Sequence, residues 1–204
     1  MSGATLVADV RTPVSERGPS PRKVIISYGF WLFLLSDIIV FSALFAAYAV
    51  LSGRTAGGPT GVQLFHRDNV LVETGCLLFS SFTCAMMSLA IEMRRRGLMA
   101  IGAALTFALG AAFLWLELWE FADMIAHGAG PSRSAFLSAF FALVGMHGLH
   151  VSIGLCWLVS MVAQVYTLGW RAMVVGRFAC FSLFWHALDI VWIGVFTIVY
   201  LGAH

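Results

Sequence analysis

Residues 30–48 read FWLFLLSDIIVFSALFAAY, an apolar run interrupted by one carboxylate, Asp37. A bilayer core about 30 Å thick is crossed by roughly 20 helical residues, so this stretch predicts a membrane-spanning helix. A carboxylate is unfavourable in hydrocarbon, and one inside a span is expected to face other helices or a polar path. We therefore expect further helices that Asp37 can face.

The composition of the whole chain indicates a membrane protein. Of its 204 residues, 60% are hydrophobic and 11% are charged, whereas a soluble domain has about 25% charged residues. The formal net charge is +2, and Lys and Arg fall in short clusters, which excludes nucleic-acid binding. The four cysteines lie singly in apolar runs without CxxC spacing, which is typical of small core residues.

Five apolar stretches are long enough to cross a bilayer. They predict an all-α, polytopic bundle of five transmembrane helices within one domain, 24–204, at about residues 24–51, 70–91, 98–126, 135–166 and 178–201. The fourth lies in an uncharged segment from Ser134 to Trp170, which predicts a long, tilted helix. Residues 1–23 are polar and contain three prolines, and we expect them to be a flexible cytoplasmic tail.

The distribution of basic residues predicts the orientation of the bundle. Nine Lys and Arg residues fall in the tail and in the second and fourth connections, and three fall on the opposite side. Because basic residues are enriched in cytoplasmic loops, we expect the N-terminus in the cytoplasm and the C-terminus in the periplasm.

Ionisable residues inside these spans are the candidate functional residues, because such side chains face a bundle interior or line a path. Glu117 and Glu120 share one stripe of their helix, and His186 and Asp189 lie one turn apart. The fourth helix carries two histidines on one face, and Gly145, Gly148 and Ser152 form nearly the opposite face, where a neighbouring helix is able to approach closely. The full set is Asp37, Glu73, Glu117, Glu120, His147, His150, His186 and Asp189.

Each of these groups has a structural interpretation and a functional one. Two close carboxyl groups such as Glu117 and Glu120 either relay protons or link helices by hydrogen bonds. His147 and His150 either ligate a metal or haem or make interhelical hydrogen bonds. The pair His186 and Asp189 either titrates or fixes the fifth helix.

Three acidic residues have individual expectations. Glu73 and Asp123 lie near helix ends, where they are able to reach the membrane edge. Asp37 shares its stripe with apolar and aromatic residues, so we expect a neutral acid that is hydrogen-bonded inside the bundle.

Five ordered segments carry a resemblance to a known family. They are WLFLLSDIIVFSALFAAYAVL, TAGGPTG, VETGCLLFSS, GPSRSAFLSAFFALVGMHGLHVSIG and FSLFWHALDIVWIGVFTIVYL. With these segments, which span about residues 27–201, the chain resembles subunit III of the haem-copper terminal oxidases. It is most similar to the five-helix form found in bacterial cytochrome o ubiquinol oxidases.

The resemblance implies an accessory subunit without a catalytic centre. In this family, ubiquinol is oxidised and oxygen is reduced to water in subunit I, which holds haem and copper, while protons are pumped. The chain would pack against subunit I in the bacterial inner membrane, in one complex with subunits II and IV, and support stability and proton uptake. No haem, copper or quinol site is implied in this chain, whereas a bound phospholipid is compatible with the family.

Only a few candidate positions match the family's segments. Asp37 stands at the place of a carbodiimide-reactive glutamate of the mitochondrial forms and is one methylene shorter. Glu120 matches an acid of the family's helix. His147 and His150 fall within its HGLH segment, and the fifth-helix pair falls within its WHxxD segment.

Two alternatives to the accessory subunit remain at the level of sequence. One is a stand-alone proton-coupled transporter that uses Asp37, Glu120 and Asp189. The other is a haem protein that uses His147 and His186.

Overall fold

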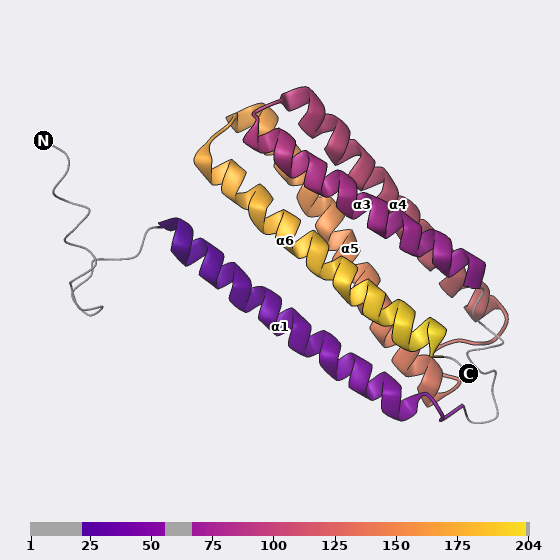
Figure 1. The fold of residues 1–204 in the computed structure, drawn as a ribbon. Helices are drawn as coiled ribbons and strands as arrows, with labels where there is room; N and C mark the ends of the chain where they lie inside the picture. Colours follow the sequence, from indigo (N-terminus) through magenta and orange to yellow (C-terminus); the bar gives the residue numbers. More distant parts are fainter. Residues whose placement is uncertain (1–21, 56–66, 203–204) are drawn as a thin grey trace, which may run out of the picture.

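The computed structural model describes residues 22–55 and 67–202, and this part of the chain is all-helical. The helices, labelled in Figure 1, are α1 (Arg22–Leu51), α3 (Arg67–Glu92), α4 (Arg96–Ala126), α5 (Ala135–Leu168) and α6 (Ala172–Val195). A π-helical segment, Phe196–Leu201, continues α6 to the end of the described chain. Five helices of this part are long and apolar enough to cross a membrane, as the sequence predicts.

The helix bounds differ from the predicted spans mainly at α6. This helix begins at Ala172, six residues before the predicted start, because Arg177 lowers the local hydropathy without ending the helix. At 34 residues α5 is the longest helix, in agreement with the uncharged segment. The predicted tail, 1–23, lies outside the described residues except for Arg22 and Lys23, which belong to α1.

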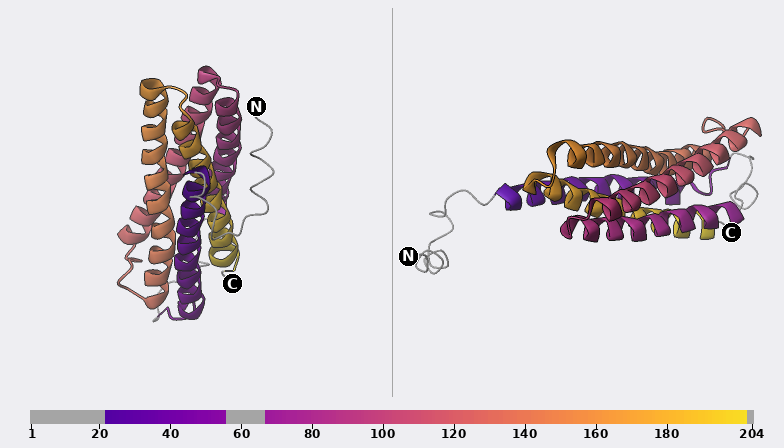
Figure 2. Two further views of the ribbon diagram at one scale, coloured as in Figure 1. Left: turned by 90° about the vertical axis from the view of Figure 1, so that its left-hand side faces the viewer. Right: turned by 90° about the horizontal axis from the view of Figure 1, so that it is seen from above.

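The helices form an elongated bundle with α1 along one side. The most extensive pairing joins α3 and α4, and α5 and α6 pack beside them (Figure 1). The principal neighbours of α1 are α5 and α6, and the long axes of all the helices run roughly together (Figure 2). A backbone hydrogen bond from Phe136 N to Arg54 O, 3.4 Å long, joins the end of α1 to the first turn of α5.

Local sequence signals set both ends of α5. Ser134 is its N-cap, with extended backbone angles and a hydroxyl that accepts a 3.2 Å hydrogen bond from Leu137 N, as an N-cap serine does. Gly169 ends the helix with φ 71°, a left-handed angle that glycine adopts without strain.

Glycines allow close contact between helices at two places. A Cβ atom on Gly102 of α4 would lie 2.9 Å from Met87 Cβ and 3.1 Å from Met87 Cα, so α3 and α4 approach at backbone level. On the predicted small face of α5, a Cβ on Gly148 would lie 2.6 Å from Glu117 Oε1. The small face therefore packs against α4, as helices with small residues do in membranes.

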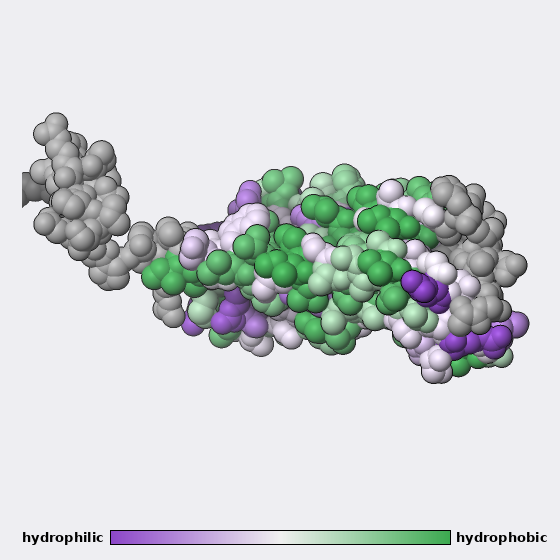
Figure 3. All heavy atoms as spheres, turned by 90° about the horizontal axis from the view of Figure 1, so that it is seen from below, coloured by the Kyte–Doolittle hydropathy of each residue, from purple (hydrophilic) through white to green (hydrophobic). Residues whose placement is uncertain are grey.

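The exterior of the bundle is apolar over most of its length. Figure 3 shows hydrophobic residues across most of the face that it presents, with strongly hydrophilic residues towards the ends. Large side chains such as Trp115 (73% exposed) and Ile39 (65% exposed) contribute to this exterior. Such a surface matches the hydrocarbon of a bilayer or the apolar face of a partner.

Candidate functional site

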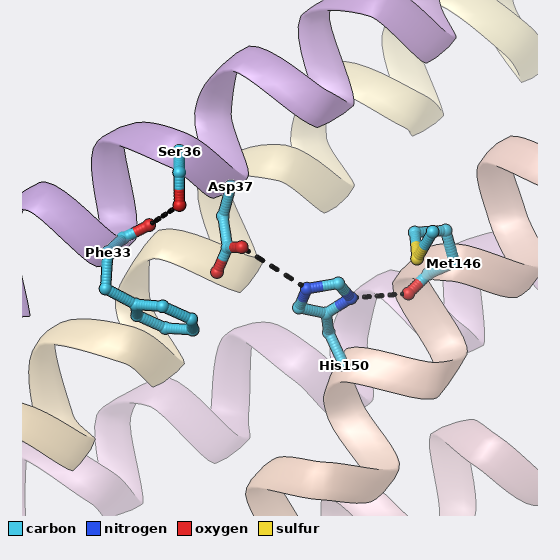
Figure 4. Close-up of polar contacts among 5 residues, drawn as sticks. All are labelled: Phe33, Ser36, Asp37, Met146 and His150. Carbon is cyan, nitrogen blue, oxygen red and sulfur yellow. Dashed lines mark hydrogen bonds and ion pairs between the residues drawn. The ribbon is translucent and has the colours of Figure 1, made fainter.

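Asp37 and His150 pair α1 with α5, as Figure 4 shows. The distance from Asp37 Oδ1 to His150 Nε2 is 3.7 Å, an ion-pair distance that exceeds a hydrogen bond. The expectation that Asp37 faces the bundle is therefore met, whereas the direct hydrogen bond that we expected is not formed with this histidine. The two side chains are largely buried, 22% and 15% exposed.

The other nitrogen of His150 constrains how this pair shares protons. His150 Nδ1 lies 2.8 Å from Met146 O (Figure 4), and a carbonyl oxygen only accepts hydrogen bonds. Nδ1 therefore carries a hydrogen, and Nε2 faces Asp37 either as a protonated donor or as an acceptor. In the first case the pair is an imidazolium with a carboxylate, and in the second it is a neutral imidazole with a neutral acid. In both states the Nε2 side of the ring faces the Asp37 carboxyl group.

His147 lies one turn away, inside a group of aromatic rings. The side chain is fully buried, and its ring centre is 5.1 Å from that of Trp192 and 5.6 Å from that of Phe113. Neither ring nitrogen has a hydrogen-bond partner among the described residues. Aromatic rings surround the imidazole on several sides, an arrangement unlike the open position of a haem ligand.

A second group of acids lies where α3, α4 and the π-helical segment meet. Glu73, Glu117 and Glu120 are 1%, 2% and 6% exposed, and we call these three residues the carboxyl cluster. Their electrostatic interactions place them close to one another. Tyr200 donates a 3.5 Å hydrogen bond from its hydroxyl to Glu120 Oε2. The interpretation that Glu73 reaches the membrane edge is wrong, because this side chain turns inwards.

His186 and Asp189, the pair predicted on the fifth helix, both make polar contacts across the α3–α6 interface. His186 Nδ1 lies 3.3 Å from Ser81 Oγ, and Ser81 also interacts with Asp189. Within the described residues, no ion pair joins His186 to Asp189. Both side chains therefore link α6 to α3, which supports the structural interpretation of this pair.

Two tryptophans of α6 extend the same interface and were not predicted as functional residues. Trp185 Nε1 donates to Ser80 Oγ at 3.0 Å, and Trp192 Nε1 donates to Thr74 Oγ1 at 3.1 Å. A sequence signal for them existed, because a buried indole N–H needs an acceptor and serine and threonine recur along α3. The partners themselves depend on how the two helices are placed.

The remaining candidate groups are peripheral. Asp123 and His127 form a 3.5 Å ion pair at the end of α4, where both side chains are well exposed, as expected near a membrane edge. No group of three His, Cys, Asp or Glu side chains within the described residues is arranged to hold a metal ion. The geometry thus supports structural linkage and proton sharing, and it does not fit metal chemistry in these residues.

Comparisons with known proteins find similarity over most of the chain. Residues 16–204 match the family model described as cytochrome c oxidase subunit III. Cytochrome bo(3) ubiquinol oxidase subunit 3 of Pseudomonas aeruginosa is 53% identical over 174 residues, which cover 85% of this chain and 83% of the relative. Quinol oxidase subunit 3 of Bacillus subtilis is 43% identical over 176 residues, which cover 85% of each chain.

Proposed function

Because the chain belongs to the cytochrome c oxidase subunit III family, we propose that it is the accessory third subunit of a proton-pumping ubiquinol oxidase. The observation that carries this proposal is the family match, which covers all five spans. The relatives are quinol oxidase subunits, so the alternative of a stand-alone transporter is set aside.

The way α1 packs supports a role inside a larger complex. Only 11% of its membrane span is buried within this chain, against 33–39% for the other four spans. Its exposed apolar side chains therefore need lipid or another subunit beside them. We propose that subunit I packs directly against this chain and that subunits II and IV complete the complex in the bacterial inner membrane.

Haem and copper, which the family implies for the complex, do not fit the residues of this chain that the structure describes. His147 is enclosed by aromatic rings, and the other candidate ligand, His186, lies with Nδ1 3.3 Å from Ser81 Oγ at the α3–α6 interface. His150 is paired with Asp37. The cysteines of the described segments lie singly in separate places. We therefore assign haem and copper to subunit I, and the haem-protein alternative loses its two ligands.

A groove between α1 and α6 supports the proposal of a bound phospholipid. Apolar side chains, among them Leu34, Phe41, Phe184 and Val191, line it together with Asp37. An acyl chain matches such an apolar lining in chemistry. This groove is the place in the described chain where we expect lipid to contribute to stability.

The proposed function is tested by native purification through a tag on this chain. We expect haem-bearing subunits to copurify and the preparation to consume oxygen when ubiquinol is supplied. As the control, the tagged chain from cells that lack subunit I should be colourless. Stoichiometric haem in that control, or proton or solute movement by the isolated chain in liposomes, would contradict the proposal.

A further inference from the structure

Several buried oxygens of the carboxyl cluster have no hydrogen-bond partner among the described residues. The accessory role does not explain how these oxygens are stabilised. Neither oxygen of Glu73 has a hydrogen-bond partner among the described residues, and the same is true of Glu117 Oε2 and Glu120 Oε1. An unsatisfied buried polar group destabilises a fold, and a charged one does so more. Three neighbouring carboxylates without an ion-pair partner would also repel one another.

The surroundings of the cluster restrict what is able to satisfy these oxygens. Trp192 lies beside it, because its indole N–H is bonded to Thr74, next to Glu73, and its ring centre is 6.3 Å from that of Tyr200. On the α5 side, the Glu117 carboxyl lies against Gly148, where no side chain intervenes. With exposures of 1–6%, the three acids are shielded from a group supplied by another subunit.

A metal ion is a poor match for this site. Within the segments that the structure describes, no three acids or histidines have the arrangement of a metal site. Asp123, a further acid, interacts with Glu120, and among the described side chains no Lys or Arg forms an ion pair with the cluster. Water and protons remain, since a buried water makes about three hydrogen bonds to otherwise unsatisfied groups.

We propose that the carboxyl cluster is an internal hydrated site, in which ordered water molecules bridge Glu73, Glu117 and Glu120 and the acids share protons through them. Glu73 from α3, the two acids of α4 and Tyr200 of the π-helical segment then form one network. The π-helical segment brings the Tyr200 hydroxyl to Glu120. The site holds three parts of the bundle together by water-mediated hydrogen bonds, which are nearly as favourable as direct ones.

The test is infrared spectroscopy of the complex purified through this chain, in H2O and in D2O. We expect a protonated-carboxyl stretching band that shifts in D2O. Glu73→Gln, Glu117→Gln and Glu120→Gln should each remove part of that band and shift what remains, because the acids are coupled. Glu92→Gln, which changes an exposed acid on α3, is the matched control and should leave the band unchanged.

Two kinds of result would overturn the proposal. One is a band that none of the three substitutions alters, or losses that leave the residual band unshifted, because the acids would then be ionised or independent. The other is a density map of the unmodified complex with a dry contact or a metal ion at the cluster in place of water. The map needs no variant, so the proposal stays testable if one variant fails to assemble. Both measurements report on the carboxyl groups of this chain, so their outcome does not depend on which electron donor the complex uses.

Discussion

At the scale of single residues, the Asp37 and His150 pair shows how a carboxylate is accommodated in an apolar span. The hydrogen on His150 Nδ1 is fixed by Met146 O, so the Nε2 side of the ring faces Asp37, at 3.7 Å. Apolar side chains such as Phe41 and Phe184 line the groove beside the acid. The histidine is the polar neighbour that α5 places opposite this acid.

Substitutions at this pair are expected to separate the two protonation states. Asp37→Leu should destabilise the attachment of α1, because His150 Nε2 loses its partner. Asp37→Asn should retain most of the stability, because its amide N–H is able to donate to a neutral imidazole. Thermal melting of the purified complex, followed by release of this chain, provides the measurement.

A double-mutant cycle supplies the control for this pair. Asp37→Leu combined with His150→Leu should be non-additive by about 0.5–3 kcal/mol, the range for residues in contact. Strict additivity would show that the two side chains are not coupled. A loss for Asp37→Asn as large as that for Asp37→Leu would instead identify a charged pair.

At the scale of helices, the bundle depends on close approach where glycine stands in place of a side chain. Gly102 meets the backbone of Met87, so an added methyl group has no flexible neighbour to displace. Trp185 uses a related arrangement: Cβ atoms on Gly110 and on Gly154 would each lie 3.0 Å from its indole ring. These two glycines, on α4 and α5, make room for a large ring that α6 inserts between them.

Gly102→Ala is expected to destabilise the α3–α4 pair. The added Cβ would lie 2.9 Å from Met87 Cβ, and overpacking of this kind costs about 1–3 kcal/mol. Gly75→Ala on α3 is the control, because nothing lies within 4 Å of its Cβ position. The melting temperature of the purified complex should fall for Gly102→Ala and not for Gly75→Ala, and equal melting temperatures would contradict this assignment.

The sequence predicts the helices well and their contacts poorly, for a physical reason. Hydropathy and basic boundaries are local, so the five spans are visible in the chain. The inward turn of Glu73 and the position of Ser81 between His186 and Asp189 depend on how α3 and α6 are placed. The π-helical segment at Phe196–Leu201 has no sequence signal either, although it decides where Tyr200 points.

At the scale of the whole molecule, the charge distribution predicts the orientation in the membrane. Nine of the twelve basic residues fall on the side that we assign to the cytoplasm. The end of α1 and the start of α4 lie at opposite ends of the bundle (Figure 1). A single labelled position at each end is therefore enough to test the assignment.

Gly53 and Gly97 suit this test because both are exposed, and among the described residues no neighbour lies within 4 Å of their Cβ positions. We expect Gly53→Cys to react with a membrane-impermeant thiol reagent in intact spheroplasts, because positive-inside orientation places it outside. Gly97→Cys should react only after the membrane is permeabilised. The unmodified chain is the control, since its four cysteines all lie within the helices. The reverse labelling pattern would show that the bundle has the opposite orientation. Arg94, Arg95 and Arg96 would then lie on the outer surface, which would contradict the positive-inside assignment.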